Sequence, residues 1–299
     1  LKRKNKMILK IGSNGKEVKE LQEFLEIQAD GIFGKGTDTA VREWQQDEGL
    51  VVDGIVGPAT WNSMGLASTD ISEQVFETEN CLIVEKHYLP KGEYKVGPTK
   101  KEYVFLHHTA GWHNPFKTIN RWGRDDRGAI ATEFVLGGQS VRGNDSKYDG
   151  KMVQAFPEGG YGWHLGNNGS PYMHTNSVAI EVCNFGYIVD GKTYAGTIVD
   201  ESQIVTLKEP FRGYKTWHRY SDKQIENLRL WLLWIAERDN IDIREGLPSL
   251  IKEKGAKAFD FNPDAYYGKI KGTWTHTNTR RDKFDMFPQD ELLEMLTNL

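Results

Sequence analysis

Apolar residues recur at helical spacing within the first sixty positions of the chain. Two sets flank a polar turn, namely Val18, Leu21 and Leu25, then Ala40, Val41 and Trp44. Such spacing places the members of each set on one face of an amphipathic helix. The first part of the chain is therefore predicted to be a small helical module.

An internal repeat supports this interpretation. The sequence Asp-Gly-Ile-Phe-Gly-Lys-Gly-Thr at 30–37 returns 23 positions later as Asp-Gly-Ile-Val-Gly-Pro-Ala-Thr at 53–60, and five of the eight residues are identical. Asp-Gly is a turn-forming pair, and a threonine hydroxyl can accept from backbone N–H groups as an N-cap. Each copy is predicted to be a turn that leads into a helix.

The pattern changes after residue 66. Residues 67–80 are rich in Ser, Thr, Asp and Glu and show little periodicity, which indicates a solvated linker. Beyond it, runs of β-branched and aromatic residues predict strands at 103–106, 132–136 and 178–182. A domain boundary is therefore predicted within 67–80.

One long helix is predicted over residues 221–240. Ser221 and Gln224 form a capping box at its start, and apolar residues follow at helical spacing. Strands mixed with helices predict an α/β domain over residues 81–299, with a central mixed β-sheet flanked by helices. We expect this domain to follow a small all-α domain of three helices over residues 1–66.

Composition narrows the class of protein. Hydrophobic residues make up 38% of the chain and charged residues 27%, which is typical of a globular protein. The longest apolar runs are far below the roughly 20 residues that a transmembrane helix needs. The basic stretch 2–6 is followed by too short an apolar segment for a signal peptide. Cys81 and Cys183 are interpreted as two buried thiols.

The charge balance argues against a nucleic-acid partner. The net charge is −4, and residues 8–66 contain five basic and ten acidic side chains. Binding to phosphates would need a basic patch that displaces counterions.

Three segments concentrate side chains that could bind a metal or transfer protons. They are the residues around His107 and His108, the apolar run that contains Glu181, and the segment from His276 to Asp285. A glutamate inside an apolar strand is informative, because a buried carboxylate needs a partner or a shifted pKa.

A catalytic zinc ion usually takes three protein ligands and leaves one position for water. His107, His276 and Asp285 meet that requirement if the fold brings them together. Glu181 could then accept a proton from water, and Lys283 could balance the charge that develops on a carbonyl oxygen.

The segment 9–66 resembles the three-helix peptidoglycan-binding domain of many cell-wall hydrolases. The matching features are Gly12 and Gly15, Leu21-Gln22, both Asp-Gly-Ile-x-Gly-x-x-Thr turns, Trp44-Gln45, Gly49-Leu50 and Thr60-Trp61. This resemblance implies that the module binds bacterial peptidoglycan.

The segment 103–288 resembles the zinc amidases that include phage amidase lysozymes, anhydro-muropeptide amidases and animal peptidoglycan recognition proteins. Five motifs occur in the family's order: His107-His-Thr-Ala110, Trp163-His164-Leu-Gly166, Asn176-Ser-Val-Ala-Ile-Glu181, Tyr220-Ser-Asp-Lys-Gln224, and His276 followed by Lys283-Phe-Asp285. The resemblance implies cleavage of the amide bond between N-acetylmuramic acid and L-alanine.

Carried over by position, the resemblance assigns zinc to His107, His276 and Asp285, base catalysis to Glu181, and stabilisation of the oxyanion to Lys283. It also places His164 in the substrate groove. Four other histidines are interpreted as structural or surface residues, namely His108, His113, His174 and His218.

Two features depart from the family's pattern. Many relatives have an aromatic residue and a histidine before the phenylalanine of the second strand, where this chain has Ala131-Thr132-Glu133-Phe134, and the role of Glu133 is unassigned. Asp282 is an alternative to Asp285 as the third ligand, since the interval after His276 varies among relatives.

An active amidase that acts as a monomer is the first hypothesis. The alternatives are a recognition protein that binds muropeptides without cutting them, and a glycosidase with paired carboxylates, which would leave the histidines unexplained. An amidase with a wall-binding module and no signal peptide resembles a phage endolysin, made in the host cytoplasm and acting on the cell wall. A bacterial autolysin is the alternative setting.

Overall fold

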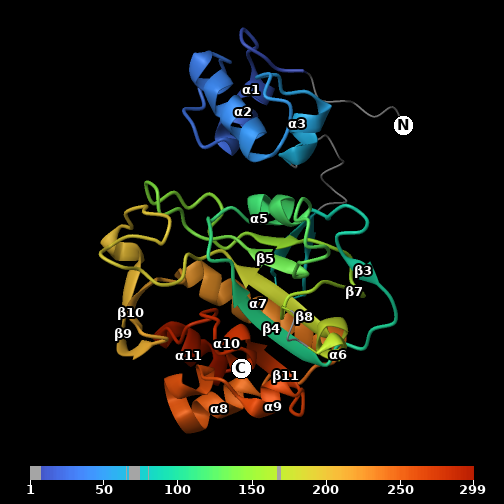
Figure 1. Ribbon diagram of the computed structural model, residues 1–299, viewed down its shortest axis with the longest axis vertical. Coiled ribbons are helices and arrows are strands. Elements are labelled where there is room, and N and C mark those ends of the chain that lie inside the picture. Colours follow the sequence, from blue (N-terminus) through green and yellow to red (C-terminus); the bar gives the residue numbers. More distant parts are fainter. Residues whose placement is uncertain (1–7, 65, 67–74, 80, 167–169) are drawn as a thin grey trace. The chain divides into compact units, whose positions relative to one another are not determined.

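The computed structural model describes residues 8–64, 66, 75–79, 81–166 and 170–299, and Figure 1 shows it as a ribbon. The chain divides into two units, Leu1–Ile71 and Ser72–Leu299. The basic stretch 2–6 and residues 67–74 and 80 of the predicted linker lie outside the described residues. Among the described residues, no helix is long and apolar enough to cross a membrane.

The second unit is built on a mixed seven-stranded sheet (Figure 1) with the strand order β1-β2-β6-β5-β8-β4-β11. The strands are β1 (Val75–Glu77), β2 (Ile83–Lys86), β4 (Tyr103–His108), β5 (Phe134–Leu136), β6 (Met152–Gln154), β8 (Ser177–Val182) and β11 (Gly272–Thr275). The β1–β2 and β5–β6 pairs are antiparallel, and the other four pairs are parallel. The predicted mixed sheet is confirmed.

Helices cover both faces of this sheet. In β5, Phe134 and Leu136 belong to the apolar cluster that contains the buried face of α7 (Asp222–Asp239), which crosses behind β4 and β8 in Figure 1. Val135, between them, belongs instead to the cluster that contains Ile119 of α5 (Pro115–Trp122). Alternate residues of a strand point to opposite faces, so the sheet lies between two helical layers.

The described residues of the second unit form further elements outside the main sheet, α5 and α7. They are β3 (Lys95–Val96), β7 (Gly160–Tyr161), β9 (Ile204–Phe211), β10 (Tyr214–His218), α6 (Pro171–Thr175), α8 (Leu247–Lys254), α9 (Pro263–Tyr266), α10 (His276–Thr279), α11 (Asp290–Thr297), η1 (Glu201–Gln203) and η2 (Gly255–Phe259). Strands β9 and β10 form a separate two-stranded sheet, as do β3 and β7.

Of the local expectations from the sequence, two need correction and two are confirmed. Residues 75–77 form strand β1 rather than linker, because Phe76 packs against Trp234 and the segment pairs with β2. Cys81 is exposed in the turn before β2, whereas Cys183 is buried as expected. The capping box of Ser221 and Gln224 is present at the start of α7.

The described residues of the first unit form three helices, α1 (Lys16–Phe24), α2 (Lys35–Asp47) and α3 (Pro58–Ser63). They enclose a small apolar core of ten buried residues: Leu9, Val18, Leu21, Phe24, Phe33, Val41, Trp44, Val56, Trp61 and Met64. The predicted helical module with an internal repeat is confirmed.

A buried glutamine closes each copy of the repeated turn. The Gln22 side-chain nitrogen lies 2.8 Å from Asp30 Oδ1 and 2.9 Å from the Ile32 carbonyl oxygen, and its oxygen accepts from the Gly31 N–H at 2.8 Å. The Gln45 side chain repeats these contacts with Asp53, Ile55 and Gly54 at 2.9, 3.0 and 2.8 Å. The two turns are therefore held by equivalent polar clamps.

The repeated threonines belong to these clamps and are not N-caps, which corrects the expectation from sequence. Thr37 lies inside α2, whose N-cap is Gly34, and its hydroxyl contacts the Gln22 side-chain nitrogen at 3.0 Å. Thr60 contacts Gln45 in the same way at 3.3 Å. Both threonine side chains are buried beside the glutamine amide.

Replacing Gln45 by alanine should destabilise the first unit by about 3 kcal/mol, because the turn's backbone groups lose their partner in a buried position. Hydrogen exchange of full-length protein should then accelerate by about 100-fold in peptides from residues 14–64. Gln46→Ala is the matched control, since Gln46 is the next residue of α2 and is exposed. Equal exchange in the two variants would contradict the clamp.

Candidate metal and catalytic site

The site lies where three parallel strands end at the same edge of the sheet. In β4, His107 pairs in register with Glu181 of β8. On the other side of β4, Leu106 pairs with Thr275, the last residue of β11. His276 follows Thr275 directly, so the chain brings His276 beside His107 although 169 positions separate them in the sequence.

Local hydrogen bonds fix the segment 276–285, which contains His276, Lys283 and Asp285. His276 starts α10, and Asn278 Oδ1 accepts from the backbone N–H of Thr275 at 3.0 Å as part of a capping box. The backbone N–H of Thr277 donates to the carbonyl oxygen of Asp285 at 3.0 Å. These contacts fold the chain after α10 back onto the end of β11.

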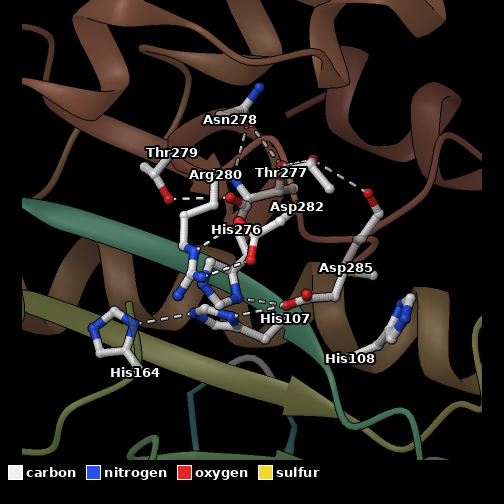
Figure 2. A network of polar contacts seen from close by, with 12 residues as sticks. His107, His108, His164, His276, Thr277, Asn278, Thr279, Arg280, Asp282 and Asp285 are labelled. Atoms are coloured by element: carbon white, nitrogen blue, oxygen red, sulfur yellow. Dashed lines mark hydrogen bonds and ion pairs between the residues drawn. The ribbon is translucent and has the colours of Figure 1, made fainter. Parts of the chain in front are cut away.

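His107, His276 and Asp285 converge on one point, as Figure 2 shows. Asp285 Oδ2 lies 3.0 Å from His107 Nδ1 and 3.0 Å from His276 Nδ1. Burial lowers the pKa of His107 to about 4, although its contact with Asp285 acts in the opposite direction. Burial alone would raise the pKa of Asp285, but His276 and His107 hold it well below its usual range.

This group fits a tetrahedral metal site. Two imidazole nitrogens and one carboxylate oxygen are a common donor set for catalytic zinc, and in such a site the ligand atoms are about 3.3 Å apart. The two Nδ1–Oδ2 distances of 3.0 Å are close to this spacing. The Nε2 atom of His276 is buried and has no hydrogen-bond partner among the described residues.

Glu181 and Lys283 lie beside this group. The Glu181 side chain has a buried Oε2 atom without a hydrogen-bond partner among the described residues. Burial and the negative charge of Asp285 hold the pKa of Glu181 well above its usual range, and Lys283 opposes this shift. An unpartnered buried carboxylate is expensive to maintain, so this position is a candidate for proton transfer.

His164 contacts the site from the side opposite Asp285 (Figure 2). His164 Nδ1 lies 3.0 Å from His107 Nε2, and its own Nε2 lies 2.7 Å from Ser177 Oγ. It therefore contacts a candidate ligand directly.

A cavity of about 270 Å³ lies next to the site. Its lining residues are His108, Ala110, Phe185, Gly186, Tyr187, Tyr194, Asp282, Lys283, Phe284 and Asp285. Lys283 and Asp285 thus connect the cavity with the polar cluster. The aromatic residues of this lining were not identified from the sequence, because no local pattern marks residues that meet only in the fold.

The third-ligand alternative, Asp282, is not brought to the histidines. Its carboxylate pairs with Arg280 at 3.0 and 2.6 Å and is largely exposed. Glu133 also lies away from the cluster, in a buried ion pair with Arg238 of α7 at 2.7 Å and a hydrogen bond from Gln154 at 3.0 Å. These contacts give the unassigned Glu133 a structural role.

The four histidines interpreted as structural or surface residues are all buried: His108, His113, His174 and His218. His108 Nδ1 lies 2.8 Å from the Tyr220 hydroxyl, and His218 Nε2 lies 3.0 Å from Gln203 Oε1. His174 accepts from the backbone N–H of His164 at 3.2 Å. His174, interpreted as structural, and Ser177, which received no role from the sequence, are thus neighbours of the site through their contacts with His164.

Two family models match this chain. The model described as a peptidoglycan binding domain matches residues 14–64, and the model described as N-acetylmuramoyl-L-alanine amidase matches residues 97–257, more than half of the chain. The second match includes His107, His164 and Glu181 and ends before His276. No curated protein matches the chain.

Several solved structures are similar to parts of it. A Burkholderia AP3 phage endolysin is 38% identical over 20% of this chain and 25% of its own, with a TM-score of 0.20. A fused Zn-dependent amidase/peptidase/peptidoglycan-binding protein from Clostridium acetobutylicum is 39% identical over 21% of this chain and 31% of its own, with a TM-score of 0.20. PlyL is 14% identical over 68% of this chain and 85% of its own, with a TM-score of 0.37. The match to the first endolysin spans about a quarter of that protein's length.

Proposed function

This chain belongs to the N-acetylmuramoyl-L-alanine amidase family, and on that premise we propose that it hydrolyses the amide bond between N-acetylmuramic acid and L-alanine in bacterial peptidoglycan. We further propose that the reaction depends on zinc held by His107, His276 and Asp285. The observation that carries this proposal is the convergence of these three side chains beside Glu181, whose buried Oε2 atom has no hydrogen-bond partner among the described residues.

The donor set suits zinc, which when bound supplies Lewis-acid polarisation of the scissile carbonyl and acidifies a water molecule. Glu181 takes the proton from the attacking water. Because burial raises its pKa, Glu181 can hold that proton and then donate it to the leaving amino group of L-alanine. One carboxylate thereby serves as base and then as acid.

Lys283 supplies a positive charge next to Asp285 and the cavity. Its ammonium group stabilises the negative charge that develops on the carbonyl oxygen as water adds. The cavity receives the substrate on the side of Lys283, and its aromatic lining offers apolar contact surface. His164 remains a candidate contact to the substrate groove.

The first unit has the role of a wall-binding module. Its family match supports peptidoglycan as the partner, and none of the proposed metal or proton-transfer residues belongs to residues 1–66. The domains we propose are a peptidoglycan-binding domain over 1–66, a connection after it, and an amidase domain that begins with β1 rather than at residue 81.

The pairing of these domains suits a phage endolysin that degrades the wall at the end of infection, and this is the setting we propose. A bacterial autolysin is the alternative. A holin gene beside the coding sequence would favour the endolysin, and its absence together with bacterial cell-division genes would favour the autolysin.

Digestion of purified peptidoglycan should release stem peptides with a free L-alanine amino group and leave intact glycan chains. Mass spectrometry of the products checks the bond that is cut. A chelator should abolish this release, and one equivalent of zinc should restore it. New reducing ends on the glycan would instead indicate a glycosidase, and binding without any product would indicate a recognition protein.

Matched aspartate variants test the ligand set. Asp285→Ala should lose zinc and activity, whereas Asp282→Ala should keep both, because Asp282 pairs with Arg280. Elemental analysis gives the zinc content, and the thermal midpoint shows that each variant folds. Loss of zinc from the Asp282 variant alone would overturn the assignment.

Glu181→Gln and Lys283→Ala should keep the metal and the fold but lose turnover. Removing a positioned base costs about 10² to 10⁴ in rate, and removing an oxyanion donor costs about 10² to 10³. Steady-state rates on a soluble muropeptide, with zinc content measured on the same samples, check both roles. Near wild-type turnover in either variant would remove that residue from the mechanism.

A chain that starts at Ser72 retains β1 and should bind sacculi more weakly and digest them more slowly than the full-length protein. Tethering raises the local concentration of the catalytic domain on a polymer, and a soluble muropeptide offers no such anchor. Pull-down on purified sacculi and rates on both substrates check this. Equal binding by the two chains refutes the module's role, and an equal loss on both substrates shows that it supports the catalytic fold.

A further inference from the structure

A line of hydrogen bonds runs from the candidate metal site into the interior of the second unit. Asp285 Oδ2 contacts His107 Nδ1 at 3.0 Å, and His107 Nε2 contacts His164 Nδ1 at 3.0 Å. His164 Nε2 then contacts Ser177 Oγ at 2.7 Å, and that hydroxyl donates to the carbonyl oxygen of His174 at 3.4 Å. Every ring nitrogen of His107 and His164 thus has one defined partner.

The carbonyl oxygen at the end of this line favours one of its two possible directions. A backbone carbonyl oxygen can only accept, so a Ser177 hydroxyl that donates to His174 must accept from His164 Nε2. The hydrogen of neutral His164 is then on Nε2, and its Nδ1 presents a lone pair to His107. That lone pair needs a hydrogen on His107 Nε2, which leaves the lone pair of His107 on Nδ1, facing Asp285.

The Nδ1 lone pair of His107 and the Oδ2 atom of Asp285 lie 3.0 Å apart and repel each other unless a cation lies between them. A metal ligand requires such a lone pair facing the cation. A second proton on His164 would oppose it, because two N–H groups would then face each other between His164 and His107. The protein therefore prepares a lone pair on the atom that points to the metal position.

The backbone at His164 is fixed separately. Its N–H donates to His174 Nδ1 at 3.2 Å, and His174 Nε2 lies 3.3 Å from the carbonyl oxygen of Gly166. Because that carbonyl only accepts, His174 carries its hydrogen on Nε2 and keeps Nδ1 free to accept from His164. His174 thus holds the main chain that carries the His164 ring.

Without a cation, the hydrogen bonds of this line from Asp285 to Ser177 can also point in the opposite direction. A hydroxyl both donates and accepts, so Ser177 can donate to His164 Nε2, and hydrogens then shift to Nδ1 of both imidazoles. His107 Nδ1–H would donate to Asp285 in that state. Ser177 is the group that permits both directions.

We propose that His164, with Ser177 behind it, is a positioning residue that fixes the Nε2–H tautomer of His107 and thereby its Nδ1 lone pair for the metal. This inference rests on the proposed function, since it needs the metal that the function assigns to His107. It gives His164 a role other than substrate contact, in agreement with its absence from the residues that line the cavity.

The experiment measures zinc affinity by competition with a chromophoric chelator. His164→Ala should weaken zinc binding by about 10- to 100-fold, because outer-shell partners of metal ligands contribute that much to affinity. His164→Asn should recover part of the loss, since its side-chain oxygen can accept from His107 Nε2. Ser177→Ala should weaken binding in the same direction by a smaller factor.

His87→Ala is the matched control, because His87 contacts Asn120 at 2.6 Å and follows β2, which is not a neighbour of β4 or β8 in the sheet. Its zinc affinity should equal that of the wild type. Thermal midpoints with zinc and with chelator separate a folding defect from a binding defect, and the Ser177 variant keeps the test decisive if His164→Ala does not fold.

Nitrogen NMR of the zinc-loaded wild type supplies a readout independent of any variant. Long-range ¹H–¹⁵N spectra should place the hydrogen of both His107 and His164 on Nε2. A hydrogen on Nδ1 of His164 would overturn the inference.

The outcomes for the inference and for the proposed function are distinct. A wild-type protein that binds no zinc refutes the metal centre itself. If the wild type and His164→Ala bind zinc equally and the variant shows only a raised KM, the metal centre is supported and the inference is refuted. His164 then contacts the substrate instead.

Discussion

The arrangement of this site depends on the in-register parallel pairing of β4 with β8 on one side and β11 on the other. Parallel strands end at the same edge of a sheet, so side chains from three distant segments meet there without any local sequence relation. His107 and Glu181 are direct partners in this register, and His276 is the first residue after β11. A shift of one residue in either pairing would turn the strand's side chains to the opposite faces.

Buried polar groups in the second unit fall into two classes. Glu133 is buried, but Arg238 and Gln154 satisfy its carboxylate, so the group adds to the specificity of packing between the sheet and α7. Glu181 Oε2 and His276 Nε2 have no such partners among the described residues. Leaving a buried polar atom unpaired costs stability, and at these two positions a bound metal or a reacting group would supply the missing contact.

Strand and helix patterns predicted the sheet and the long helix α7 from the sequence, because both rest on residue type and local spacing. The grouping of His107, His276 and Asp285 followed instead from the order of motifs that resembles the zinc amidases, since no local spacing relates residues 169 positions apart. The roles of Glu133, Thr37 and Ser177 could not be predicted in that way. Glu133 meets a partner 105 positions away. Thr37 looks like a cap and instead contacts a buried glutamine, and Ser177 contacts His164 from 13 positions away. Such roles depend on tertiary contacts that single-sequence patterns do not encode.

The two units are stabilised in different ways, and this difference affects which unit can contain a catalytic site. The first unit has a small apolar core, and a small domain gains little from burial, so its repeated turns are completed by fully satisfied glutamine clamps. The second unit has apolar clusters on both faces of a seven-stranded sheet. That larger core offsets the cost of unpaired polar atoms at the strand ends. The second unit can therefore retain Glu181 Oε2 and His276 Nε2 without hydrogen-bond partners among the described residues.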